Sequence, residues 1–192
     1  GIVVYAMPGF LPRFSELLTQ SLLVSTGQMT NEAFEASLAA SNGKVVIDPN
    51  ELRAERLVHL GEKLLGHKMD EMAEAKFLEA IEVSAGYVPA RLALGDLYRR
   101  QGELDKAEAQ CGAIVKADPD STVGRLALAR VWVARGGDSL NQAEAAVRGV
   151  LERHPETARA HYLLGLIFEA RGDIPAAAAS YRTAAELLLD HE

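Results

Sequence analysis

The residue types that most often carry catalysis or bind metals do not occur here at catalytic spacings. No two of the five histidines are four residues apart, the spacing that places two zinc ligands on one helical face. The chain also has no P-loop, no glycine-rich dinucleotide fingerprint and no Gly-x-Ser-x-Gly nucleophile elbow. The histidines are His59, His67, His154, His161 and His191. We therefore predict a protein that is not an enzyme and that uses no cofactor and no metal.

The composition is that of a globular chain and argues against nucleic acid as a partner. Of the 192 residues, 48% are apolar and 24% are charged, and the net charge is −7. Phosphate binding requires a basic face, which a chain with this excess of acid is less suited to provide. The single cysteine, Cys111, excludes an internal disulfide, so nothing indicates an oxidising compartment.

Matched residues recur at intervals of 34 to 36 positions, which predicts a stack of identical supersecondary units. Each unit has a leucine, a small residue directly after it and a large residue four positions after the leucine; an alanine and a second apolar residue follow later. In order, these are Leu60, Leu94, Leu128 and Leu164; Gly61, Gly95, Ala129 and Gly165; Leu64, Tyr98, Trp132 and Phe168; Ala73, Ala107, Ala143 and Ala177; and Phe77, Cys111, Val147 and Tyr181.

The spacing within each unit predicts two helices joined by a turn. Positions i, i+1 and i+4 lie on one helical face, where the small residue allows a second helix to approach closely. Gly102, Gly136 and Gly172 stand where a helix end needs a left-handed residue. Asp105 and Asp173 are candidate caps of the following helices. Since Cys111 occupies one of the apolar repeat positions, we expect a buried, unreactive thiol.

This pattern resembles the tetratricopeptide repeat, whose units consist of Leu-Gly, an aromatic residue, and Ala…Phe…Pro over 34 residues. The resemblance covers about the last 140 residues and implies an all-α fold, a right-handed α-solenoid of helix–turn–helix units. Four units fit, 54–87, 88–121, 122–157 and 158–191. The first lacks the turn glycine and the terminal proline, and the third has two extra residues in its turn.

Residues 1–53 do not follow the repeat pattern and form a separate N-terminal extension. Helical patterns alternate there with β-branched runs at 2–5 and 44–47, and Asp48-Pro49 predicts the start of a long helix. The extension is either a mostly helical cap on the first repeat or the remnant of another domain. Because the chain begins with Gly1, we expect a processed or engineered fragment. No capping helix follows 187–189, so either further repeats follow in the full-length protein or this end packs on another chain.

The resemblance also implies which side chains face the concave groove formed by the first helix of each unit. At the N-terminal end these positions are acidic, as at Glu55 and Glu62, and further along they combine apolar residues with arginines. The expected partner-binding residues are Leu92, Asp96, Arg99, Arg100, Leu126, Arg130, Val133, Arg159, Tyr162 and Leu166.

Two hypotheses about the partner follow from these positions. The chaperone-binding members of the family hold a C-terminal carboxylate with Lys and Asn, whereas Val58, Glu62, Leu92 and Asp96 stand here, so we predict no heat-shock co-chaperone. The arginines could instead hold an acidic peptide with a hydrophobic anchor near Tyr162 and Leu166. The alternative is that they are solvated or paired with neighbours such as Asp96 and Glu169.

The favoured interpretation is a non-enzymatic scaffold or adaptor that binds a partner peptide or helix in the groove. The Ala- and Arg-rich composition favours a bacterial protein, and similar bacterial repeat proteins support assembly, secretion and envelope biogenesis. Two alternatives stay open: a docking module of a larger enzyme or signalling protein, and a self-assembling oligomer. The sequence does not decide between cytoplasm and periplasm. A membrane would be reached only through an upstream anchor or a membrane-protein partner.

Overall fold

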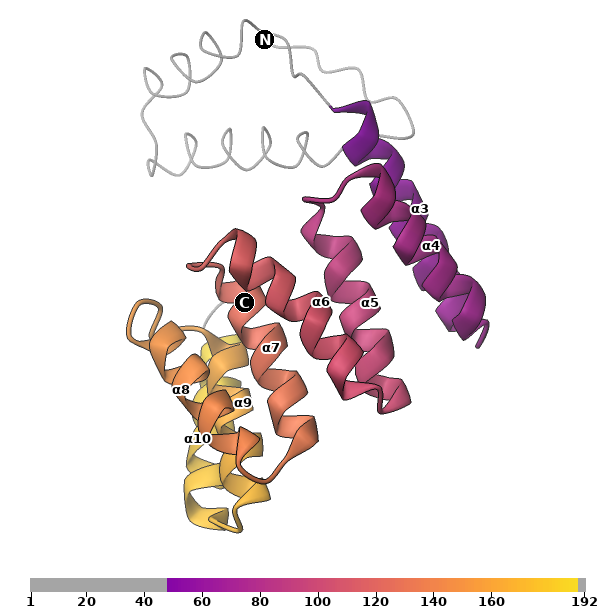
Figure 1. Cartoon of the computed structure of the whole chain (residues 1–192). Helices are drawn as coiled ribbons and strands as arrows, with labels where there is room; N and C mark the ends of the chain where they lie inside the picture. Colours follow the sequence, from indigo (N-terminus) through magenta and orange to yellow (C-terminus); the bar gives the residue numbers. More distant parts are fainter. Residues whose placement is uncertain (1–47, 190–192) are drawn as a thin grey trace, which may run out of the picture. The chain divides into compact units, whose positions relative to one another are not determined.

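The computed structural model describes residues 48–189, and this part of the chain is entirely helices and turns without a β-strand (Figure 1). The helices are α3 (Pro49–Gly66), α4 (Asp70–Val83), α5 (Val88–Gln101), α6 (Leu104–Ala117), α7 (Thr122–Arg135), α8 (Ser139–Leu151), α9 (Ala158–Ala170) and α10 (Ile174–Leu189). The predicted all-α solenoid of helical repeats is confirmed.

The helices form four successive pairs, and each pair packs on the next (Figure 1). The first helices of the last three pairs, α5, α7 and α9, also contact one another directly, which makes them one continuous wall. The core between the layers combines repeat positions such as Phe77 and Leu94 with Leu163 and Ile167, which the pattern does not single out; all four are 0–1% exposed. The repeat leucine Leu60, in contrast, is 44% exposed. Burial of these faces stabilises the stack, because no single pair could cover its own apolar surface.

The repeated glycines bring the two helices of a pair together, as the sequence predicts. An ideal Cβ built on Gly61 would lie 2.4 Å from the Phe77 ring, and one on Gly165 would lie 2.3 Å from the Tyr181 ring. On Gly95 the same atom would lie 2.9 Å from the Cys111 sulfur. An alanine at these positions would overlap the partner helix, so the glycines are needed for the close approach.

The turns agree with the predicted pattern in most but not all units. Gly102 and Gly172 both have φ of 79°, whereas Gly136 combines φ of 70° with ψ of −161° and so is not in the left-handed helical region. In the first unit Lys68 takes the repeat position of these glycines, and its φ is also positive, at 59°. The two extra residues of the third unit explain the difference at Gly136, since they lengthen that turn.

The two candidate caps differ in outcome. The Asp173 carboxylate accepts a hydrogen bond from the Ala176 amide at 3.1 Å and caps α10, as predicted. The expectation for Asp105 is wrong, because α6 begins at Leu104 and places Asp105 inside its first turn. The Asp105 carboxylate accepts instead a hydrogen bond from Arg135 on the next repeat.

The repeats lie in one compact unit that begins at Ala54. The predicted helix start is present, with the Asp48 carboxylate accepting from the Asn50 amide at 2.8 Å. The expectations for the extension at 1–47, including its β-branched runs, lie outside the described residues. None of the helices in residues 48–189 combines the length and apolar character that crossing a bilayer requires.

Candidate partner-binding groove

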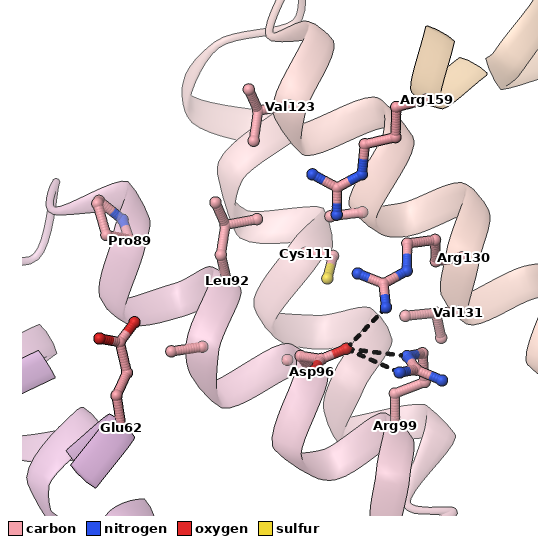
Figure 2. Close-up of a pocket in the computed structure, with 13 residues that line it drawn as sticks. Glu62, Pro89, Leu92, Asp96, Arg99, Cys111, Val123, Arg130, Val131 and Arg159 are labelled. Carbon is pink, nitrogen blue, oxygen red and sulfur yellow. Dashed lines mark hydrogen bonds and ion pairs between the residues drawn. The ribbon is translucent and has the colours of Figure 1, made fainter. Parts of the chain in front are cut away.

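The carboxylate of Asp96 forms ion pairs with three of the four arginines on the groove side of the first helices. Asp96 on α5 accepts hydrogen bonds from Arg99 at 2.8 and 3.1 Å and from Arg130 at 3.1 Å, both at the same oxygen (Figure 2). Its second oxygen lies 2.9 Å from Nε of Arg100. The Arg130 contact joins α7 to α5 and therefore links two repeats.

The charges in this cluster are unbalanced. Burial raises the pKa of Asp96, but the hydrogen bond from Arg99 and the charges of Arg130, Arg99 and Arg100 outweigh it and leave the pKa below its usual 3.8. Burial is also the main reason why the pKa of Arg130 is lowered; the attraction of Asp96 opposes this, and the nearby charges of Arg99, Arg159 and Arg100 add to it. Each arginine remains protonated, so the cluster retains excess positive charge.

Arg159 on α9 differs from the other three arginines because it makes no hydrogen bond or ion pair within residues 48–189. Its side chain extends beside that of Arg130, with no dashed contact to Asp96 (Figure 2). Three arginines thus share one carboxylate, and the fourth, Arg159, is exposed and has no counter-charge within residues 48–189.

These side chains border a cavity of about 340 Å³ that we call the arginine pocket. It is lined by Glu62, Pro89, Leu92, Ala93, Gly95, Asp96, Arg99, Cys111, Val123, Ala127, Arg130, Val131 and Arg159. Burial raises the pKa of the Cys111 thiol to about 11, and the side chain is 2% exposed, in agreement with the expected buried sulfur. Glu62 of α3 lies across the pocket from the arginines (Figure 2).

A second cavity of about 490 Å³, the tyrosine pocket, lies at the α9–α10 pair. It is lined by Ala158, Arg159, Tyr162, Tyr181, Ala184, Ala185 and Leu188. Between the two lies a smaller cavity of about 270 Å³ lined by Arg99, Arg130, Val133, Ala134, Tyr162 and Leu166. Because Arg159 and Tyr162 each line two of these cavities, the three are neighbours along one groove.

The structure brings most of the predicted partner-binding residues together. Eight of the ten line at least one of the three cavities, and the other two are Arg100 and Leu126. Arg100 is exposed at the edge and pairs with Asp96, whereas Leu126 is only 3% exposed and packs in the core. Leu126 therefore does not face the groove.

Sequence reasoning did not assign Tyr181 and Leu188 of α10 to the groove. Tyr181 occupies the repeat position of Phe77, Cys111 and Val147, which are 0–2% exposed, and it was predicted only as a packing residue. Cys111 and Tyr181 both line a cavity from this position, the arginine pocket and the tyrosine pocket respectively. The signal in the sequence is that a tyrosine, with a polar tip, replaces a purely apolar residue.

Comparison with known proteins agrees with this architecture. Profiles of the tetratricopeptide repeat match residues 126–188 and 88–131. No curated protein shows significant sequence similarity to the chain. This chain belongs to the tetratricopeptide repeat family, whose fold is a protein–protein interaction scaffold and whose members are generally non-enzymatic.

Several solved structures share the fold at low sequence identity. TTC0263, a tetratricopeptide repeat protein of Thermus thermophilus, is 22% identical with a TM-score of 0.63, and the match covers 70% of this chain and 74% of that one. A crystal structure of MamA is 18% identical with a TM-score of 0.57 and 98% coverage of both chains. MamA 41-end from Desulfovibrio magneticus RS-1 is 17% identical with a TM-score of 0.57, covering 95% of this chain and 98% of that one.

Proposed function

We propose that this protein is a non-enzymatic adaptor that holds an acidic segment of a partner protein in the groove formed by α5, α7 and α9. The hydrophobic anchor of that segment would lie near Tyr162 and Leu166. The observation that carries the proposal is the imbalance of charge: Arg99, Arg100 and Arg130 share the single carboxylate of Asp96, and Arg159 adds a further positive charge close to Arg130.

The geometry of the cluster suits carboxylates. Guanidinium groups bind carboxylates through two parallel hydrogen bonds, and Asp96 already holds two nitrogens of Arg99. Such preordering lowers the entropy that a partner would lose on binding. Arg159 supplies a free guanidinium next to these fixed groups, so a ligand carboxylate gains a partner without displacing Asp96.

The test uses a fluorescein-labelled twelve-residue peptide with four glutamates in a Gly/Ser background, with binding followed by fluorescence anisotropy. We expect Arg159→Glu to weaken binding by about tenfold or more, because it reverses a charge that contacts the ligand. Arg182→Glu is the matched control: Arg182 is an exposed arginine of α10 that lines none of the three cavities. Equal loss in both variants, or no binding of the peptide by the wild type, would refute the proposal.

We further propose that the adaptor acts in a bacterial assembly, secretion or envelope-biogenesis system. The bacterial sources of similar structures, Thermus thermophilus and Desulfovibrio magneticus, support this proposal. Capture of partners from native cell extract by the wild type but not by Arg159→Glu would identify the system. Partners retained by both would place the binding surface outside the groove.

A further inference from the structure

We infer that Glu62 makes the arginine pocket selective for a mixed-charge segment, in which a basic residue accompanies the acidic stretch and lies toward α3. This inference rests on the proposed function, since it takes an acidic ligand in the groove as given. It adds the chemistry of the rest of that ligand and the order in which its charges occur.

Two opposite charges face the arginine pocket without neutralising each other. Glu62 on α3 and Arg159 on α9 both line it, and the structure of residues 48–189 contains no ion pair between them. The Glu62 carboxylate instead lies 3.3 Å from Nδ1 of His59, a histidine that is charged only when protonated, and its side chain is 56% exposed. Glu62 therefore offers a ligand a negative charge, just as Arg159 offers a positive one.

The fold keeps these two charges apart. Helix α3 shares a core cluster with α5 through Val58 and Leu94, and α5 in turn contacts α7. Leu92 of α5 lines the pocket and lies between Glu62 and the arginines (Figure 2). The pocket therefore has an acidic end at α3, an apolar strip on α5 and a basic end at α7 and α9. It is flanked by repeats on both sides.

This arrangement decides which segments fit. A wholly acidic segment that extends toward α3 is repelled by Glu62, and charges at a partly shielded site interact more strongly than in bulk water. A lysine or arginine at the same place gains a partner. Packed helices lie about 8–10 Å apart, so about 20 Å separates α3 from α7. An extended chain covers that distance in about six residues, which sets the spacing between the basic and the acidic residues.

The experiment uses fluorescein-labelled twelve-residue peptides and fluorescence anisotropy. Each peptide has four glutamates in a Gly/Ser background and one variable position about six residues from the nearest glutamate, occupied by lysine, glycine or glutamate. The series is made twice, with the variable position before the glutamates and after them. Both are needed because the pocket charges determine which end of the segment is basic but not the direction of its backbone.

In one of the two series we expect the lysine peptide to bind about threefold tighter than the glycine peptide, and the glutamate peptide to bind most weakly. General attraction to the excess of arginine would give the opposite order, because lysine reduces the negative charge of the peptide. The expected order in either series supports the inference. The opposite order, or equal binding, in both series would overturn it. The proposed function would stand as long as the glycine peptide binds the wild type and is weakened by Arg159→Glu.

Charge reversal at Glu62 gives the second measurement. Glu62→Lys should invert the order, so that the glutamate peptide binds tightest and the lysine peptide most weakly. Glu82→Lys is the matched control, because Glu82 is an exposed glutamate of α4 that lines none of the three cavities, and it should keep the wild-type order. Inversion in both variants, or in neither, would overturn the role of Glu62.

One further outcome concerns the source of the segment. If the ligand were a second copy of the chain, light scattering would show a mass that rises with concentration in the wild type and in Glu82→Lys but not in Glu62→Lys. That result would overturn a separate partner as the occupant. A constant mass together with the inverted order in Glu62→Lys supports the mixed-charge segment.

Discussion

Two sets of arginines in this molecule have the same chemistry but different surroundings. The junction arginines, Arg135 and Arg171, each bind two side chains of the preceding repeat. Arg135 reaches Glu108 at 2.5 Å and Asp105 at 2.6 Å, and Arg171 reaches Glu144 and Asn141 in the same way. Within residues 48–189 the groove arginines, Arg99, Arg100, Arg130 and Arg159, have Asp96 as their only ion-pair partner.

The difference separates a structural role from a binding role. The donors of a junction arginine are satisfied within the protein, and the same contact recurs 36 residues later, which is the behaviour of a stacking element. The groove arginines follow no such rule, and their excess charge is satisfied only by solvent or by an anionic partner. An arginine in a helical repeat is thus best interpreted from the number of acceptors it has, and its exposure alone is less informative.

The largest effect should come from removing the shared carboxylate with Asp96→Asn. This substitution leaves the groove arginines without their counter-charge, and we expect the free energy of unfolding to fall by about 1–3 kcal/mol. The affinity for an acidic peptide should rise about threefold to tenfold, since the ligand then replaces the missing charge. Urea unfolding and fluorescence anisotropy measure the two changes. A loss of both stability and affinity would mean that Asp96 is required to position the arginines.

The same substitution predicts a pH dependence. Because the pKa of Asp96 is lowered in the folded state, its stabilising charge is fully effective above its unfolded pKa and is lost as the pH falls through the folded pKa. The difference in unfolding free energy between wild type and Asp96→Asn should therefore be constant from about pH 7 to about pH 5. It should fall towards zero below about pH 4. Asp138→Asn is the control, because that carboxylate is exposed and makes no capping hydrogen bond at the start of α8, so the substitution should leave the stability unchanged.

A smaller effect is expected at the repeat junctions. Arg135→Gln and Arg171→Gln should each lower the free energy of unfolding by about 1 kcal/mol, because the paired side chains are partly shielded from water. Neither should change the affinity for an acidic peptide, since neither arginine lines a cavity of the groove. Urea unfolding and anisotropy on the same preparations provide both values. Weaker peptide binding in either variant would abolish the distinction between the two sets.

The repeat pattern predicted the fold and much of the groove, but not the charge balance within it. Periodicity placed Gly61, Gly95 and Gly165 at the close helix contacts because each unit repeats the same packing problem. It could not reveal that Asp96 binds Arg130, because a contact between repeats depends on how two first helices align. Nor could it reveal the tyrosine pocket, since the role of Tyr181 depends on what covers α10. The pattern also assigned one residue too many to the groove: Leu126 has a groove position in the repeat but is buried in the structure.

The smallest effect should be that of Trp132→Phe, which tests the junction more finely. The Trp132 Nε1 donates to Glu108 at 3.0 Å, and Arg135 binds the other oxygen of the same carboxylate. Phe168 occupies the same repeat position in the next unit, where Arg171 binds Glu144 without such a donor. Since Glu108 keeps Arg135, we expect a loss of only about 0.5–1 kcal/mol, measured by urea unfolding. In an Arg135→Gln background the same change should cost more, because Glu108 then loses both donors. Strict additivity of the two substitutions would show that the arginine and the tryptophan stabilise the junction independently.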